Sequence, residues 1–295
     1  MIKAFKVAGQ VFCLQLPDGS DMLQYLSQYD PFVTDAAEDA IFTLSQVEKL
    51  ERPEGMKLLY KSPGEDPGEP TINLYSTPDG SWFFEMSPMQ TFPVCAWMKA
   101  DADLKRAEIE LGSCRDRGFA INNALMLLYA FATSERNILE MHASVIKYRG
   151  KAYLFLGKSG TGKSTHSKQW LKAIKGTSLL NDDNPIVRVE DDGTVMVYGS
   201  PWSGKTPCYK NECCPAGAFV RIRQAPENRI ERMPLVESYA IIYSSSSGYK
   251  SDRRMSDGLH STMEKVVTTT PCYILDCLPN EDAALVCAKE VVKDE

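Results

Sequence analysis

Short stretches in which apolar and polar residues alternate dominate the first part of the chain. Residues 4–16 and 71–88 alternate with a period of two and are rich in β-branched and aromatic side chains, which is typical of strands. Residues 78–80, Pro-Asp-Gly, divide the second stretch and favour a tight turn, because proline presets φ and glycine accepts a positive φ. The pattern predicts a smaller, mostly β N-terminal module over residues 1–115, for which the sequence indicates no chemical role.

The spacing of apolar residues changes after this module. Residues 119–135 are apolar at helical spacing and nearly all round, which predicts a buried helix. Residues 138–157 read as two strands joined by a turn, and residues 164–175 have the pattern of a helix. Strand-like and helical segments continue to alternate up to the C-terminus. We therefore expect an α/β domain over residues 116–295.

Composition and charge narrow the class of protein. The 295 residues are 43% hydrophobic and 24% charged, an ordinary globular composition, and the net charge of −6 argues against nucleic acid as a partner. No apolar run reaches the roughly 18 residues that a membrane helix needs, and the N-terminus lacks the apolar core of a signal peptide. We expect a cytoplasmic protein with no membrane partner. Its nine cysteines are then reduced thiols, and the cluster of Cys208, Cys213 and Cys214 lacks the spacing of a zinc site.

One segment carries a specific chemical signal. Residues 157–164 fit the pattern G-x-x-x-x-G-K-[ST], placed between a predicted strand and a predicted helix. In such a loop the backbone N–H groups cradle phosphates, the lysine reaches the β- and γ-phosphates, and the hydroxyl after it ligates Mg²⁺. We therefore predict binding of a nucleotide, ATP with Mg²⁺, by Gly157, Lys158, Ser159, Gly160, Thr161, Gly162, Lys163, Ser164 and Thr165.

Phosphoryl transfer also needs a carboxylate that holds the metal or accepts the proton of the acceptor. Asp182 and Asp183 end an apolar strand that follows the helix of the glycine loop. Neighbouring side chains at a strand end point in different directions, so one carboxylate can face the metal and the other the incoming hydroxyl. We take both as catalytic residues, Asp182 as the metal ligand together with Ser164, although the pattern leaves open which aspartate has which role.

Residues 141–165 and 179–184 together resemble the catalytic domain of the HPr kinase/phosphorylase family. That family shares its fold with ATP-dependent phosphoenolpyruvate carboxykinase, and residues 157–165 are similar to the carboxykinase loop as well. The resemblance implies a phosphoenolpyruvate carboxykinase-like core with a mixed sheet. It also implies that His142, on the strand before the loop, lies at the active site beside the catalytic Lys163. The HPr kinases assemble as hexamers, which leaves a homo-oligomer open for this chain.

The expected activity is that of a kinase: an ATP- and Mg²⁺-dependent phosphotransferase that moves the γ-phosphate to a hydroxyl. The acceptor stays open between a protein or peptide serine and a small molecule. Two other classes remain: a short carboxykinase-like lyase, and a non-catalytic ATP-binding regulatory module.

Several single residues are ambiguous. His166, in the first turn of the predicted helix, is expected to be partly exposed, and His260 is expected in a polar loop. The turn at residues 200–205, SPWSGK, fits a surface loop with Trp202 tucked in and equally a turn that meets the phosphates. Four arginines are candidates for clamping an anion, and nothing in the sequence selects among Arg221, Arg223, Arg253 and Arg254.

Overall fold

The chain has a mixed α/β fold with two mixed sheets in two compact units. The computed structural model describes residues 1–62, 70–112, 117–204 and 206–292. The units comprise Met1–Ala132 and Thr133–Glu295, and each contains one sheet. Within the described residues, no helix combines the length and the apolar character that are needed to span a bilayer.

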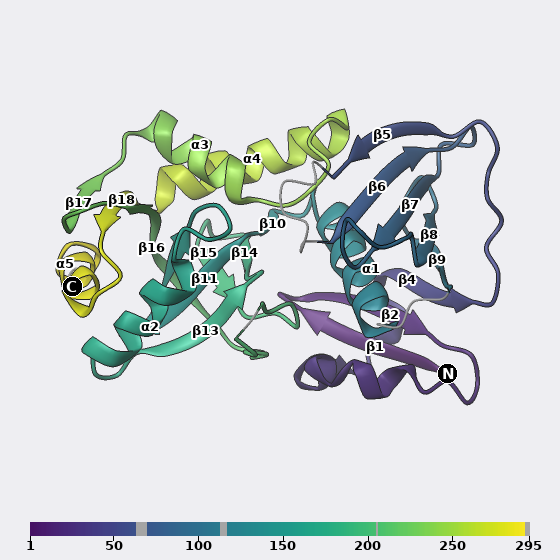
Figure 1. The fold of residues 1–295 in the computed structure, drawn as a ribbon, viewed down its shortest axis with the longest axis horizontal. Helices are drawn as coiled ribbons and strands as arrows, with labels where there is room; N and C mark the ends of the chain where they lie inside the picture. Colours follow the sequence, from purple (N-terminus) through teal and green to yellow (C-terminus); the bar gives the residue numbers. More distant parts are fainter. Residues whose placement is uncertain (63–69, 113–116, 205, 293–295) are drawn as a thin grey trace. The chain divides into compact units, whose positions relative to one another are not determined.

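In the first unit, nine described strands form one sheet in the order β3-β1-β2-β4-β9-β8-β7-β6-β5 (Figure 1). The pairs β2–β4 and β4–β9 are parallel and the others antiparallel. The predicted Pro-Asp-Gly hairpin is confirmed, since Ser76 pairs with Trp82 across it. The strands are β1 (Ile2–Val7), β2 (Gln10–Gln15), β3 (Val33–Thr34), β4 (Ala40–Val47), β5 (Lys57–Lys61), β6 (Thr71–Ser76), β7 (Trp82–Ser87), β8 (Ala96–Ala100) and β9 (Arg106–Leu111), with 3-10 turns at Met22–Tyr25, Ser27–Phe32 and Ala37–Asp39.

Helix α1 (Arg117–Ala132) belongs to this first unit and not to the second. The predicted boundary between residues 115 and 116 lies outside the described residues, but the helix that follows it packs against β4 and β9. Tyr129 stacks edge-on against Phe12, and its hydroxyl donates to the Val7 oxygen at 3.1 Å. A helix that is apolar nearly all round needs a sheet to cover it, and the first sheet does so. The unit therefore ends after the helix.

In the second unit, the strand order is β10-β14-β15-β16-β12-β11-β13, and β18 pairs with both β16 and β17. The pairs β12–β16 and β16–β18 are parallel, and the others are antiparallel. The strands are β10 (Ile138–Glu140), β11 (Ala143–Tyr148), β12 (Lys151–Leu156), β13 (Ser178–Asp183), β14 (Ile186–Val189), β15 (Val195–Tyr198), β16 (Cys213–Gln224), β17 (Arg229–Arg232) and β18 (Cys272–Cys277); the helices are α2 (Lys163–Ala173), α3 (Leu235–Ser245), α4 (Arg253–Thr269) and α5 (Glu281–Val291).

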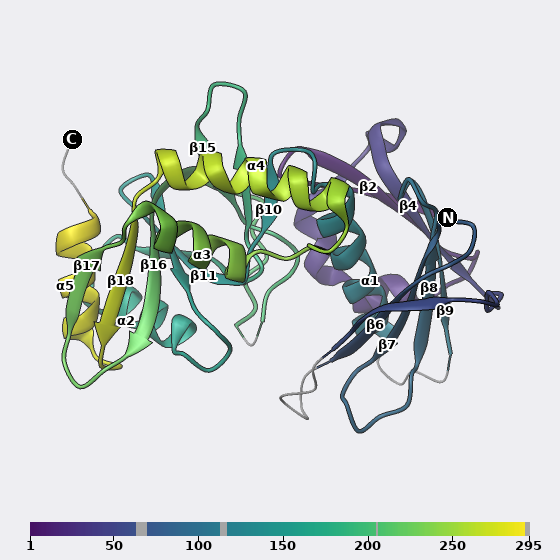
Figure 2. The ribbon, with the colours of Figure 1, turned by 90° about the horizontal axis from the view of Figure 1, so that it is seen from above.

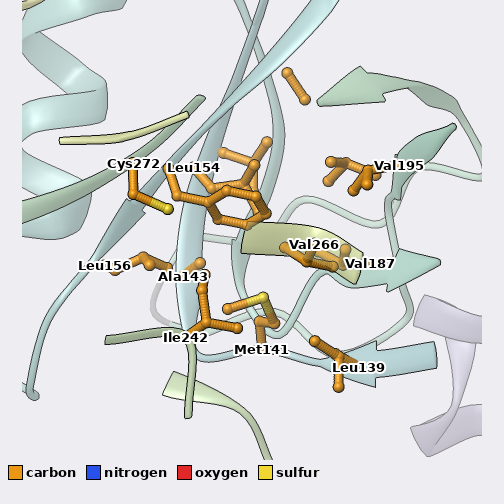
Figure 3. Close-up of a cluster of buried hydrophobic side chains, with 14 of the residues drawn as sticks. Leu139, Met141, Ala143, Leu154, Leu156, Val187, Val195, Ile242, Val266 and Cys272 are labelled. Carbon is orange, nitrogen blue, oxygen red and sulfur yellow. The ribbon is translucent and has the colours of Figure 1, made fainter. Parts of the chain in front are cut away.

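Helices cover both faces of this second sheet (Figure 2). Alternation along β12 divides its side chains between two cores: Leu154 and Leu156 pack with residues of α3 and α4, whereas Tyr153 and Phe155 pack with Trp170 of α2 and with α5. The first of these cores is shown in Figure 3. A central strand buried on both faces reads as a continuous apolar run, which is what residues 152–156 are.

Helix α4 corrects the prediction that His260 lies in a polar loop. Apolar residues recur along it at helical spacing, including Met255, Leu259 and Met263, and all three are buried. Gly258 lies within this helix, at a position where the Cβ of any other residue would come within 2.5 Å of the Ser134 oxygen. The glycine therefore permits a close approach between backbones and does not mark a turn.

Candidate functional site

The predicted site residues of the second unit meet at one edge of its sheet. Strand β11 lies between β12 and β13, and Ala143 pairs with Leu156 on one side and with Asp183 on the other. Both neighbours are antiparallel to β11, so β12 and β13 run in the same direction and end at the same edge. Two strand spacings separate them, about 10 Å. The glycine loop after Leu156 and the aspartates at the end of β13 are therefore neighbours in space.

The loop joins β12 to α2, which is the strand–loop–helix arrangement that the motif requires. Gly157 has a φ of 149°, and a Cβ there would lie 2.6 Å from Thr161 Oγ1. Only glycine fits this start of the loop without displacing Thr161. Helix α2 begins at Lys163, and the N–H groups of its first turn have no acceptor within the helix. These amides and the positive end of the helix dipole suit an anion.

A chain of hydrogen bonds connects the loop lysine to the aspartates. Lys163 Nζ lies 2.8 Å from His142 Nε2, and His142 Nδ1 lies 3.0 Å from Asp183 Oδ1. An ammonium group only donates, so Nε2 is the acceptor and the ring proton is on Nδ1, which donates to Asp183. The three predicted residues thus form one relay.

Lys163 is poised to exchange partners. Its ammonium also donates to the backbone oxygens of Gly157 at 2.9 Å and Lys158 at 3.2 Å. Burial lowers the pKa of Lys163, while the negative charges of Asp183 and Asp182 act in the opposite direction. A buried lysine whose hydrogen-bond acceptors among the described residues are carbonyl and imidazole groups would gain by meeting a phosphate oxygen.

Asp182 is a buried residue whose carboxylate has no partner among the described residues. The residue is 4% exposed, and its side chain makes no hydrogen bond or ion pair within the described part of the chain. Burying an unpaired carboxylate is costly, and a cation is the usual remedy. The described residues contain no group of three or more His, Cys, Asp or Glu side chains that could hold a metal alone. Mg²⁺ needs no such group, since it uses one or two carboxylates together with phosphate oxygens and water. Asp182 with Ser164 therefore fits Mg²⁺ that arrives with a nucleotide.

The backbone around Asp183 is held in an uncommon conformation. Its φ is 153°, an angle that favours glycine, and such angles in other residues concentrate at functional sites. Ser203 forms an isolated bridge with Asp183, and the Gly204 N–H donates to the Asp182 oxygen at 2.7 Å. Trp202 is buried beside this turn, as the reading with a tucked-in tryptophan expects, and the turn contacts both aspartates. Lys205 lies outside the described residues.

Glu140 is a site residue that the sequence analysis missed. It is 3% exposed, its Oε2 has no hydrogen-bond partner in the described part of the chain, and it lies two residues before His142. Burial raises the pKa of Glu140 to about 8; the hydrogen bond from Ser247 opposes this rise and the charge of Asp183 adds to it. Glu140 is therefore largely protonated at neutral pH. The available signal was an acidic residue inside the otherwise apolar segment ILEM.

Two cavities flank the glycine loop. The charged cavity, about 730 Å³, is lined by His142, Lys158 and Ser159 of the loop side and by Arg221 and Arg223 of β16. The second cavity, about 560 Å³, lies between the loop and the ends of β16 and β18. Ser244 and Ser245, at the C-terminal end of α3, also line the charged cavity.

Ion pairing distinguishes the four arginine candidates. Arg223 makes a two-pronged ion pair with Asp276. Arg253 Nε lies 3.8 Å from Asp257 Oδ2, and Arg254 Nε lies 2.7 Å from Glu135 Oε2. The guanidinium of Arg221 has no hydrogen bond or ion pair among the described residues, so it is free to meet an anion.

His166 is a core residue and not a partly exposed one. It is 3% exposed, and its Nε2 accepts a hydrogen bond from Trp170 Nε1 at 3.0 Å. Burial lowers the pKa of His166 to about 4, so the ring is neutral. The cysteine cluster is equally unremarkable: Cys208 and Cys214 are buried thiols and Cys213 is exposed.

Comparison with known proteins gives little. No family model matches the chain, and no curated protein matches it significantly. Among the solved structures that match is the HPr(Ser) kinase/phosphatase from Coxiella burnetii, at 11% sequence identity and a TM-score of 0.31, over 51% of this chain and 86% of that chain. Similarity at this level supports no conclusion about function, which has to be inferred from the site's own residues.

Proposed function

We propose that the second unit is an ATP- and Mg²⁺-dependent kinase of the HPr-kinase-like kind, built on a phosphoenolpyruvate carboxykinase-like core. It would transfer the γ-phosphate of ATP to a hydroxyl of an unidentified protein, peptide or small molecule. The observation that carries the proposal is the relay from Lys163 through His142 to Asp183, at the edge where the glycine loop and the strand-end aspartates meet.

The loop residues bind and polarise the phosphates. The free amides at the start of α2 and the Lys163 ammonium donate to phosphate oxygens, which neutralises charge that develops on the transferring group. Lys163 would give up its bonds to Gly157 and Lys158 for these stronger, charge-assisted ones.

Asp183 is assigned the role of general base. Its Oδ1 accepts from His142 Nδ1, which fixes the carboxylate and leaves its other oxygen to take the proton of the acceptor hydroxyl. His142 is therefore a positioning residue for both Lys163 and Asp183. Asp182 and Ser164 would hold Mg²⁺, which would neutralise negative charge on the transferring phosphate.

The test is transfer of label from γ-labelled ATP, with Mg²⁺, to a cell extract separated into protein and small-molecule fractions. The wild type is compared with Lys163→Ala and with Lys168→Ala, an exposed lysine on α2 that serves as the control. We expect label in one fraction with the wild type and Lys168→Ala, and none with Lys163→Ala.

Each other result has a defined meaning. Nucleotide binding without transfer to any fraction would contradict the kinase and favour a regulatory module. Nucleotide-dependent release of CO₂ from oxaloacetate would identify a carboxykinase-like lyase. Equal transfer by wild type and Lys163→Ala would show that the loop does not perform the reaction.

A further inference from the structure

The second cavity beside the glycine loop differs in chemistry from the charged cavity. Its wall is formed by Gly160 and Thr165 on one side and by Ile222, Ala225 and Leu278 on the other. These last three come from the ends of β16 and β18, where parallel strands of the sheet terminate. Ligands of open α/β sheets bind outside such strand ends.

The lining of this cavity carries no charge. Among the described residues that line it there is no Lys, Arg, Asp or Glu, and His166, which also lines it, is neutral because burial lowers its pKa to about 4. Burial likewise raises the pKa of Cys277 to about 11, so its thiol stays protonated. Leu278 is 38% exposed there, an apolar surface that a flat, uncharged ligand would cover. We call this space the apolar cavity.

The two cavities share a thin partition. Gln224 lines both, and its side-chain N–H donates to the backbone oxygen of Gly160 at 3.3 Å. The glycine loop therefore separates a charged space from an uncharged one, and a molecule bound along the loop reaches both.

The loop sets the direction in which a nucleotide lies. The lysine of this motif reaches the β- and γ-phosphates, and here Lys163 contacts His142, which lines the charged cavity and not the apolar one. The γ-phosphate end thus faces the charged cavity. Thr165, in the first turn of α2, lines only the apolar cavity, so the other end of the nucleotide leaves the loop there.

We infer that the apolar cavity holds the nucleoside of the bound nucleotide, with its uncharged base against Leu278, Ala225 and Ile222. The inference rests on the proposed function and adds to it, because it places the nucleoside and the phosphate acceptor on different sides of the glycine loop. The charged cavity is then left for the acceptor. A volume of about 560 Å³ lies in the range typical of small-molecule sites.

Comparing ATP with inorganic tripolyphosphate tests the inference, since the two ligands share the phosphate chain and differ in the nucleoside. Binding of each, with Mg²⁺, is measured by calorimetry for the full chain. We expect the wild type to bind ATP at least about tenfold more tightly than tripolyphosphate, because the nucleoside buries apolar surface.

Variants of the cavity residues test whether the tighter binding of ATP arises in the apolar cavity. Leu278→Ser should weaken ATP binding about tenfold and leave tripolyphosphate binding in place, through loss of the apolar contact. Ala225→Phe, which fills the cavity, is a second variant with the same expected outcome should the first fold poorly. Leu285→Ser is the matched control, because Leu285 is also an exposed leucine, on α5, and lines neither cavity; this variant should bind ATP as the wild type does.

The outcomes separate the two proposals. Equal affinity of the wild type for both ligands, or unchanged ATP binding by both cavity variants, would overturn the nucleoside assignment while leaving the phosphate-binding loop intact. Failure of the wild type to bind either ligand would overturn the proposed function together with the assignment.

Discussion

Replacing Glu140 by glutamine removes an ionisable group from the interior of the second unit and keeps the shape of the side chain. The folded pKa of Glu140 is about 8, above the 4.5 of an unperturbed glutamate. The folded state therefore binds more protons than the unfolded state between these two values. By linkage, the free energy of unfolding falls as the pH rises through this window, and below about pH 4.5 the loss is absent.

The magnitude follows from the two pKa values. At about 1.4 kcal/mol for each pH unit between them, the full loss is about 5 kcal/mol. Because the unfolded glutamate is already partly ionised at pH 5 and the folded one is half ionised at pH 8, the loss between pH 5 and pH 8 is about 3 to 4 kcal/mol. Glutamine does not ionise, so Glu140→Gln should not show this loss.

Urea unfolding at pH 5, 6, 7 and 8, followed by tryptophan fluorescence and circular dichroism, measures this loss of stability. The quantity of interest is the free energy of unfolding of Glu140→Gln minus that of the wild type. It should rise by about 3 to 4 kcal/mol from pH 5 to pH 8, since contributions from all other groups cancel in the difference. The exposed Glu264 provides the control, and Glu264→Gln should follow the wild type at every pH. A difference that stays constant over this range would refute a buried, protonated Glu140.

Two further predictions concern the site itself. Asp183→Asn should retain nucleotide affinity within about threefold and reduce phosphoryl transfer at least about a hundredfold, because an amide cannot accept the proton. A single-turnover assay measures the transfer rate, and a rate equal to that of the wild type would show that Asp183 is not the base. Gly157→Ala should weaken ATP binding at least about tenfold, since the added Cβ would collide with Thr161 Oγ1 at 2.6 Å. Gly160→Ala, whose Cβ would meet no atom within 4 Å, should weaken binding less, and the reverse order of affinities in a titration would contradict this account of the loop.

Local chemistry was enough to predict the parts of the site that depend on consecutive residues. The loop of residues 157–164, the strand before it and the helix after it are encoded by a continuous pattern, as is the hairpin at residues 78–80. These elements depend on glycine and proline geometry and on the period of apolar residues, all of which are readable within about ten residues. The resemblance that pointed to His142 also came from such a continuous segment.

Other features depended on which surfaces meet. The apolar helix α1 was assigned to the second domain because nothing in its own sequence indicates that its partner is the first sheet. His260 was expected in a polar loop, whereas it lies on α4, in which Gly258 is required because the Ser134 oxygen lies 2.5 Å from the position of a Cβ. In both cases the deciding neighbour is distant in sequence.

Local patterns along the chain were sufficient to predict a glycine loop between a strand and a helix, a pair of acids at a strand end, and an α/β alternation after the N-terminal module. Three features became visible once the chain was folded: Lys163, His142 and Asp183 form one relay, Asp182 is buried with no partner among the described residues, and Glu140 is enclosed beside them. The physical reason is that hydrogen-bond partners, desolvation and the pairing order β13-β11-β12 are set by contacts between segments, which no local pattern encodes.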